Sequence, residues 1–109
     1  MDNFINQKCV PCEGSTTPLT REEITELLRE VNGWQQDKDT KIWREFTFKN
    51  FVQAVDFINR IADIAEYEDH HPDILLHSYK HVRVELFTHA IGGLSRNDFI
   101  VAAKINHIA

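Results

Sequence analysis

Six histidines occur in this chain of 109 residues, and two of them, His70 and His71, are adjacent. Pro72 disfavours helical geometry at His71, so the pair is expected in an irregular segment, where functional residues are common. Neighbouring residues point in different directions, so the two histidines are expected to have different roles. Imidazole donates and accepts protons near neutral pH, so metal-free acid–base catalysis is one interpretation of the pair.

His89 is a third candidate, because it stands at the end of a predicted strand beside a Gly-Gly turn. The apolar residues of that strand alternate with polar ones, as in a half-buried antiparallel strand; they are Val82, Val84 and Leu86. The same alternation places His89 on the opposite face, away from the helices.

A metal site and a purely structural role remain open as alternatives for these histidines. Histidine is the commonest metal ligand, but His-His-x-Asp matches neither HExxH nor another regular zinc or iron ligand spacing. Histidines near the end of a helix are also favoured by the helix dipole alone, without a catalytic role.

The two cysteines, Cys9 and Cys12, form a CxxC motif near the N-terminus. A zinc site would need two more ligands, and the chain has no second CxxC. A thioredoxin-like motif opens a helix after a strand, whereas the residues after Cys12 are typical of a loop. We therefore predict reduced thiols in a flexible tail over residues 1–18, with a metal or structural role of that tail as the alternative.

Composition limits the class of protein. The chain has 12 basic and 17 acidic residues and a net charge of −5, which argues against binding of nucleic-acid phosphates. No apolar run reaches the ~18 residues of a membrane span, and the first ten residues lack the features of a signal peptide. The sequence predicts a soluble, cytoplasmic protein.

Sequence patterns after residue 18 predict one domain over residues 19–109. Thr20 and Glu23 form a capping box, and Ser95 with Asp98 forms a similar helix start. The predicted elements are a helix between Thr20 and Gly33, strands at 34–36 and 41–49, a helix at 51–67, strands at 74–79 and 81–89, and a helix at 99–108. This order predicts the α+β class, a four-stranded antiparallel sheet with three helices on one face (α-β-β-α-β-β-α).

The helix predicted at 51–67 is apolar over about half of its circumference. One stripe is expected to cover the sheet and consists of Phe51, Val55, Ile58, Ala62 and Ala65. A flanking stripe is expected to need other cover and consists of Phe57, Ile61 and Ile64. We therefore predict a homodimer or homotetramer formed through the long helix and the sheet edge, without direct contact to nucleic acid or membrane.

A composite motif runs through the second half of the chain: Glu66, His70-His71-Pro72, Tyr79, His89 and Asp98. This motif resembles the signature of the pterin-4a-carbinolamine dehydratases. The stretches Phe48-Lys49-Asn50-Phe51, Thr88-His89 and Gly93-Leu94-Ser95 resemble the same family. The resemblance covers residues 19–109. At Ile74 the animal members have tryptophan, so an aromatic residue of the pterin site is either absent or supplied elsewhere.

The resemblance implies dehydration of 4a-hydroxytetrahydrobiopterin to quinonoid dihydropterin, which recycles the cofactor of aromatic amino-acid hydroxylases. Catalytic roles are implied for His70, His71 and His89, substrate contacts for these and for Pro72 and Thr88, and orienting roles for Glu66 and Asp98. The division between acid and base stays open. The pterin is the substrate, so no cofactor and no metal is implied. The alternative is a non-catalytic accessory protein of pterin or molybdopterin metabolism, or a dimerisation partner like the transcriptional coactivators among animal members.

Overall fold

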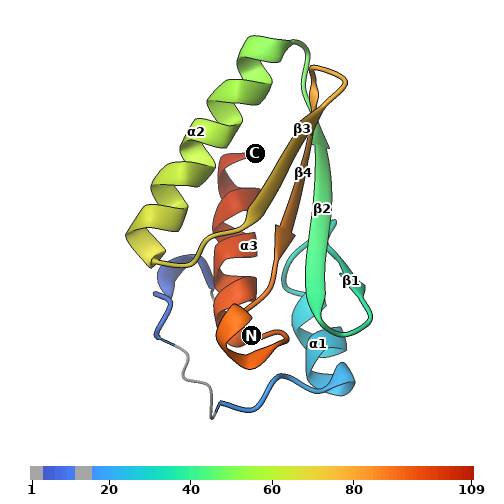
Figure 1. Cartoon of the computed structure of the whole chain (residues 1–109), viewed down its shortest axis with the longest axis vertical. Helices are drawn as coiled ribbons and strands as arrows, with labels where there is room; N and C mark the ends of the chain where they lie inside the picture. Colours follow the sequence, from blue (N-terminus) through green and yellow to red (C-terminus); the bar gives the residue numbers. More distant parts are fainter. Residues whose placement is uncertain (1–3, 12–15) are drawn as a thin grey trace.

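The structure, a computed structural model of the chain, describes residues 4–11 and 16–109 (Figure 1). Four strands form one sheet in the order β1-β2-β4-β3, and every neighbouring pair is antiparallel. The strands are β1 (Gln35–Asp37), β2 (Lys41–Thr47), β3 (Asp73–His77) and β4 (His81–Leu86). Helices α2 (Phe51–Glu68) and α3 (Arg96–Ile108) lie along one side of the sheet, and α1 (Arg21–Leu28) lies near β1. The predicted fold class is confirmed.

The helix starts are set by local side-chain caps, as the sequence predicted. Thr20 Oγ1 accepts the backbone N–H of Glu23 at 3.2 Å, and Glu23 returns the bond to the Thr20 N–H at 2.9 Å. Ser95 and Asp98 form the same reciprocal box at α3, and the Asn50 side chain caps α2. Each cap satisfies backbone donors that the first helical turn leaves without partners.

Helix α2 is rotated relative to the prediction. Phe57 and Ile61 are buried in the domain's own core, whereas Phe51 is 52% exposed. The rings of Phe46 and Phe48 each lie 4.8 Å from the Phe57 ring, and this aromatic contact turns the Phe57 stripe toward β2. The prediction that Phe57, Ile61 and Ile64 await a partner is therefore wrong for the first two, and Ile64 packs half-buried against the same core.

The N-terminal segment packs on the domain, which corrects the prediction of a free tail for residues 4–11. It begins with a short 3-10 helix, η1 (Phe4–Asn6), whose Phe4 ring is buried 6.4 Å from the Phe99 ring of α3. Cys9 is buried as well. Burial of a large aromatic side chain such as Phe4 stabilises packing of the segment on the domain by roughly 2 kcal/mol. A short polar tail would lack this stabilisation. Cys12, the second cysteine of the motif, lies outside the described residues.

The chain after β4 also differs from the prediction, because the strand ends at Leu86 instead of continuing to His89. Thr88 forms an isolated bridge to Gly93, and the residues between them fold into a short 3-10 helix, η2 (His89–Ile91). Gly92 closes this turn with φ 66°, a left-handed conformation that glycine adopts without steric cost. The reversal brings His89 out of the sheet.

Within the described ranges, no helix has both the length and the apolar character that crossing a membrane would require.

Candidate active site

A cleft of about 650 Å³ opens where α2 ends and β4 leaves the sheet. Its lining residues come from three parts of the chain and the start of α3: Lys8–Pro11, Glu68–Asp73, Phe87–Ala90 and Asn97. Five predicted site residues line it, namely His70, His71, Pro72, Thr88 and His89. Segments far apart in the sequence therefore meet at one site of a size suited to a small molecule.

The end of α2 places the two adjacent histidines. Helix α2 ends at Glu68, and Asp69 takes the left-handed conformation with φ 53°. The backbone N–H of His70 then bonds to the Ala65 carbonyl at 3.2 Å, which closes the helix end. Because the chain turns here, His70 and His71 leave the helix on a short loop, as Pro72 predicted.

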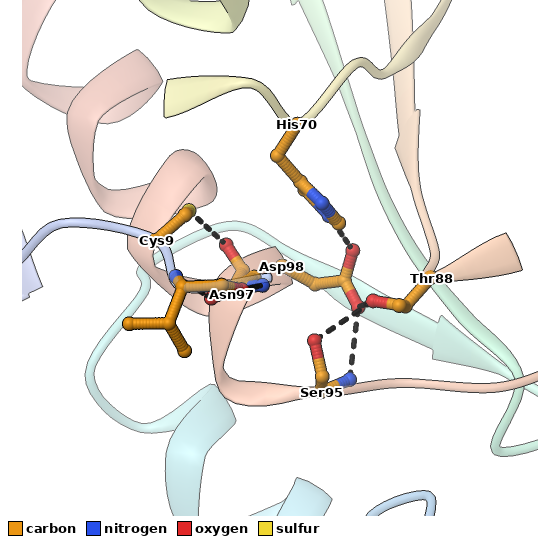
Figure 2. Close-up of polar contacts among 7 residues, drawn as sticks. Cys9, His70, Thr88, Ser95, Asn97 and Asp98 are labelled. Atoms are coloured by element: carbon orange, nitrogen blue, oxygen red, sulfur yellow. Dashed lines mark hydrogen bonds and ion pairs between the residues drawn. The ribbon is translucent and has the colours of Figure 1, made fainter. Parts of the chain in front are cut away.

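His70 is held by a buried carboxylate. Its Nε2 lies 2.6 Å from Asp98 Oδ1, and Asp98 is fully buried (Figure 2). The other oxygen, Oδ2, accepts hydrogen bonds from the Thr88 hydroxyl at 2.8 Å and the Ser95 backbone N–H at 3.0 Å. The Thr88 and Ser95 hydroxyls are themselves 2.8 Å apart. Asp98 thus makes the contacts that both suggested roles require: one oxygen caps α3 and the other bonds to His70.

This network fixes the proton arrangement on His70. With Asp98 as the carboxylate, Oδ1 can only accept, so Nε2 of His70 carries the hydrogen of this bond. Nδ1 is then the nitrogen that can take a proton from, or return it to, a molecule in the cleft. A carboxylate that orients an imidazole in this way is a recurring arrangement in acid–base sites.

His71 and Glu66 form a second, exposed pair. His71 Nε2 lies 2.5 Å from Glu66 Oε2, and both side chains are largely exposed. Glu66 therefore contacts His71 and leaves the orientation of His70 to Asp98. Because exposed ion pairs contribute little free energy, this contact holds His71 only loosely at the edge of the cleft.

His89 reaches the cleft from η2. Its ring centroid is 4.2 Å from that of Phe87, at an interplanar angle of 58°. Phe87 is the aromatic residue among those that line the cleft. Ile74, the position at which the animal members of the family have tryptophan, packs half-buried against the core. Phe87 is thus an available substitute for that aromatic residue.

The remaining histidines lie outside the cleft. His77 and His81 face each other across β3 and β4, with ring centroids 5.3 Å apart, and His77 contacts Glu45 at 2.6 Å. His107 is in the last turn of α3. Among residues 4–11 and 16–109, no three His, Cys, Asp or Glu side chains are grouped so that they could hold a metal ion.

Sequence reasoning missed a second buried carboxylate beside the site. Glu68 Oε1 accepts the Cys9 backbone N–H at 2.8 Å, and Oε2 accepts a hydrogen bond from the Lys104 ammonium group. Burial acts to raise the pKa of Glu68, but the bonds from Lys104 and the Cys9 N–H outweigh it, so this pKa lies below its ordinary value. The partners of Glu68 come from 36 and 59 residues away, so no local pattern marks it.

The position of Cys9 bears on the CxxC motif. Burial, together with the nearby Glu68 carboxylate, raises the pKa of the Cys9 thiol to about 12. At neutral pH Cys9 is therefore a thiol, whereas metal ligation and disulfide exchange need the thiolate. Cys9 therefore lies as a buried thiol in a packed segment and not in the flexible tail that was predicted.

Comparison with known proteins agrees with the site. Residues 17–108 match the family model described as Pterin 4 alpha carbinolamine dehydratase. A relative from Nitrosospira multiformis, assigned to this family by name, is 51% identical over 106 residues, which cover 97% of this chain and 92% of its own. The mitochondrial pterin-4-alpha-carbinolamine dehydratase 2 of Arabidopsis thaliana is 47% identical over 94% of this chain and 57% of its own.

Solved structures give the same picture. A transcriptional coactivator/pterin dehydratase from Brucella melitensis is 40% identical, with a TM-score of 0.79 over 85% of this chain and 99% of the other. A pterin dehydratase-like protein described as a RuBisCO assembly factor in the alpha-carboxysome is 22% identical, with a TM-score of 0.61 over 72% of this chain and 90% of the other, and shows the shared fold alone. With its fold, its cleft histidines and the match over residues 17–108, this chain belongs to the pterin-4-alpha-carbinolamine dehydratase family.

Proposed function

We propose that this chain is a 4a-hydroxytetrahydrobiopterin dehydratase, a hydro-lyase that converts pterin-4a-carbinolamine to quinonoid dihydropterin and water. The observation that carries the proposal is the His70–Asp98 pair, joined at 2.6 Å beside a cleft that His71 and His89 also line. Family membership supports the same reaction. The pterin is the substrate in this proposal, and no cofactor takes part.

The reaction needs two proton transfers and no electron transfer. The bond between C4a and its hydroxyl oxygen breaks, and the oxygen leaves as water once an acid has protonated it. A base removes the proton of N5, and the N5 electron pair forms the double bond to C4a. The acid loses one proton and the base gains one, so the proton count of the enzyme is unchanged. Proton exchange between the two groups through solvent restores the starting state, and no external reactant is needed. General acid–base catalysis contributes typically 10²–10⁴-fold to such a step.

The described residues suit these transfers. His70 exchanges a proton through Nδ1, because Asp98 occupies Nε2. His89, which enters the cleft from η2, is the second proton-transfer group. His71, loosely held by Glu66 at the edge of the cleft, contacts the pterin or receives the N5 proton. Thr88 holds Asp98 in place and lies close enough to the cleft to contact the ring.

The biological setting that we propose is the recycling of the pterin cofactor after aromatic amino-acid hydroxylation. The competing function is an accessory protein that binds a pterin or a protein partner without catalysis. The Brucella relative is described both as a transcriptional coactivator and as a pterin dehydratase, so its name supports both functions. The oriented His70 favours the enzyme, because a binding protein has no need for a buried carboxylate that fixes the tautomer of one histidine.

An activity assay with metal-depleted protein tests the proposal. After exhaustive chelation, the protein should still accelerate the dehydration of 4a-hydroxytetrahydropterin above its spontaneous rate. Activity that disappears with the chelator and returns with zinc would overturn the metal-free mechanism. Pterin binding without acceleration would overturn the enzyme assignment and favour the accessory function.

We also propose that the chain forms a homodimer or homotetramer, through surfaces that differ in part from those the sequence indicated. Strand β3 is outermost in the sheet, with its far edge unpaired within this sheet, and Leu75 on it is exposed. Phe51 and Val52 at the start of α2 are exposed as well, Val52 by 75%. An unpaired strand edge and exposed apolar residues both gain from cover by a second copy. Light scattering that gives a monomer at micromolar concentration would refute the assembly.

A further inference from the structure

Four consecutive residues of the N-terminal segment, Lys8–Pro11, line the cleft together with His70 and His71. The mechanism proposed above makes no use of them. Within these four residues Cys9 is buried, so the part of the segment that lines the cleft is also packed on the domain. The contacts that hold this segment show whether it only packs on the domain or could also contact a ligand in the cleft.

One anchor of the segment is Glu68, the last residue of α2. Its carboxylate is buried and accepts the Cys9 backbone N–H at 2.8 Å, while Lys104 from α3 neutralises it. A charged acceptor makes a stronger bond than a neutral one, and burial removes competition from water. Glu68 stands two residues before His70, so the segment is attached directly to the chain that positions that histidine.

The second anchor is Asn97, the residue before Asp98. Its Oδ1 accepts the Val10 backbone N–H at 3.1 Å, and its Nδ2 donates to the Val10 carbonyl at 2.6 Å. Figure 2 shows Asn97 and Cys9 beside Asp98 at the start of α3. One amide thus satisfies both backbone groups of Val10, in the manner of a strand pair. The backbone of Val10 is fixed, whereas its side chain remains 66% exposed.

The Val10 side chain contributes little to packing, because most of its surface is exposed although its backbone is anchored. It does suit a ligand with a flat, uncharged face, because contact with such a face removes apolar area from water on both sides. Phe87 also lines the cleft with an apolar surface. A planar heterocycle in the cleft would meet apolar groups from both the N-terminal segment and the segment after β4.

We propose that Val10 is a specificity-determining residue that contacts the face of the pterin ring, and that Glu68 and Asn97 are positioning residues that hold it there. This inference rests on the proposed dehydratase function for the identity of its ligand. Val10 has no proton to exchange, so it acts on substrate binding. Its contribution falls on KM and leaves the chemical step at His70 and His89 largely unchanged.

A matched pair of charge substitutions tests the role of Val10. Val10→Glu places a charge against the ring and should raise KM by about ten- to a hundredfold, the usual scale for a mismatch in an apolar contact, with kcat within about twofold. Ile5→Glu is the control, because Ile5 is 42% exposed on the same segment but does not line the cleft. It should leave both constants unchanged. An unchanged KM in Val10→Glu, or an equal rise in Ile5→Glu, would overturn the proposal.

The anchors have their own readout. Asn97→Ala removes the two bonds to Val10, and amide exchange at Cys9 and Val10 should accelerate at least tenfold while KM rises in parallel. Circular dichroism checks that Asn97→Ala remains folded. Faster exchange with an unchanged KM would show that the segment is packing only, and would overturn the proposal.

Binding of biopterin, which the enzyme cannot dehydrate, separates this inference from the proposed function. If the wild type binds biopterin but does not catalyse dehydration, the dehydratase assignment fails. Weaker biopterin binding by Val10→Glu would then still support a contact between Val10 and the pterin ring. If the wild type is an active dehydratase and Val10→Glu is unaltered in both assays, the proposed Val10 contact is wrong and the dehydratase assignment stands. A wild type that neither binds nor dehydrates a pterin overturns both.

Discussion

The substitution Asp98→Asn changes the proton arrangement of the site while conserving its shape. An asparagine at this position can keep its carbonyl oxygen toward the Thr88 hydroxyl and the Ser95 N–H, which are both donors. Its NH₂ group then faces His70 Nε2, which has to accept a hydrogen bond where it now donates one. His70 is forced into the other tautomer, and Nδ1 carries a hydrogen instead of a lone pair toward the cleft.

The expected loss follows from that inversion. Wrong-tautomer substitutions in comparable acid–base sites lower kcat by as much as about 10⁴, and a thousandfold fall corresponds to about 4 kcal/mol of activation free energy. Asp98→Asn also removes the charge-assisted hydrogen bonds of the carboxylate, so the free energy of unfolding should fall by roughly 1–3 kcal/mol. The folded state is checked by circular dichroism, and kcat is measured by stopped-flow dehydration of the carbinolamine.

A double-substitution cycle decides whether Asp98 acts through His70. In a His70→Ala background there is no tautomer left to control, so Asp98→Asn should lower kcat by less than about threefold. Full kcat in the folded Asp98→Asn protein would refute the orienting role. An equally large loss in the His70→Ala background would show that Asp98 acts on the substrate by another route.

Three further outcomes are expected. His107→Ala should leave kcat and KM unchanged in a steady-state assay, because His107 does not line the cleft, and loss of activity in the folded variant would mean that the site is placed wrongly. Glu68 has a lowered pKa, so its contribution to stability is present above the ordinary carboxyl pKa of about 4.3 and is lost as pH falls through the lowered value. The urea midpoint of unfolding should therefore fall more steeply on acidification in the wild type than in Glu68→Gln. Equal slopes in the two proteins would contradict this. Ile61→Glu should unfold the domain by placing a charge in its core, whereas Val52→Glu should keep the helical circular dichroism and reduce the particle size in light scattering; a folded Ile61→Glu protein would disprove the observed packing of α2.

Local patterns predicted the elements of this fold well, because the deciding interactions are local. The capping boxes at Thr20 and Ser95 join residues three positions apart, and alternation in β4 identifies its buried face directly. The rotation of α2 could not be predicted in the same way. Both of its apolar stripes satisfy helical periodicity, and the choice between them is made by the rings of Phe46 in β2 and Phe48 just after it.

The candidate site was likewise predictable only in part from the sequence. The residues of the motif, Asp98 among them, could be named through the family resemblance of their types and spacing. Which histidine Asp98 contacts is decided 28 positions away along the chain, where α3 packs beside α2. The N-terminal segment was missed for a related reason. Its eight described residues carry no periodicity, and their anchors at Glu68 and Asn97 are 59 and 87 positions distant.

Single-turnover stopped-flow of carbinolamine dehydration tests most directly whether His70 and His89 transfer the protons. The wild type, His70→Ala and His89→Ala are compared after metal removal, with biopterin binding measured on each to separate chemistry from binding. Each substitution is expected to slow the chemical step by about 10²-fold or more while biopterin is still bound. A His70→Ala or His89→Ala protein that is folded, binds biopterin and dehydrates the carbinolamine at the wild-type rate would contradict the mechanism.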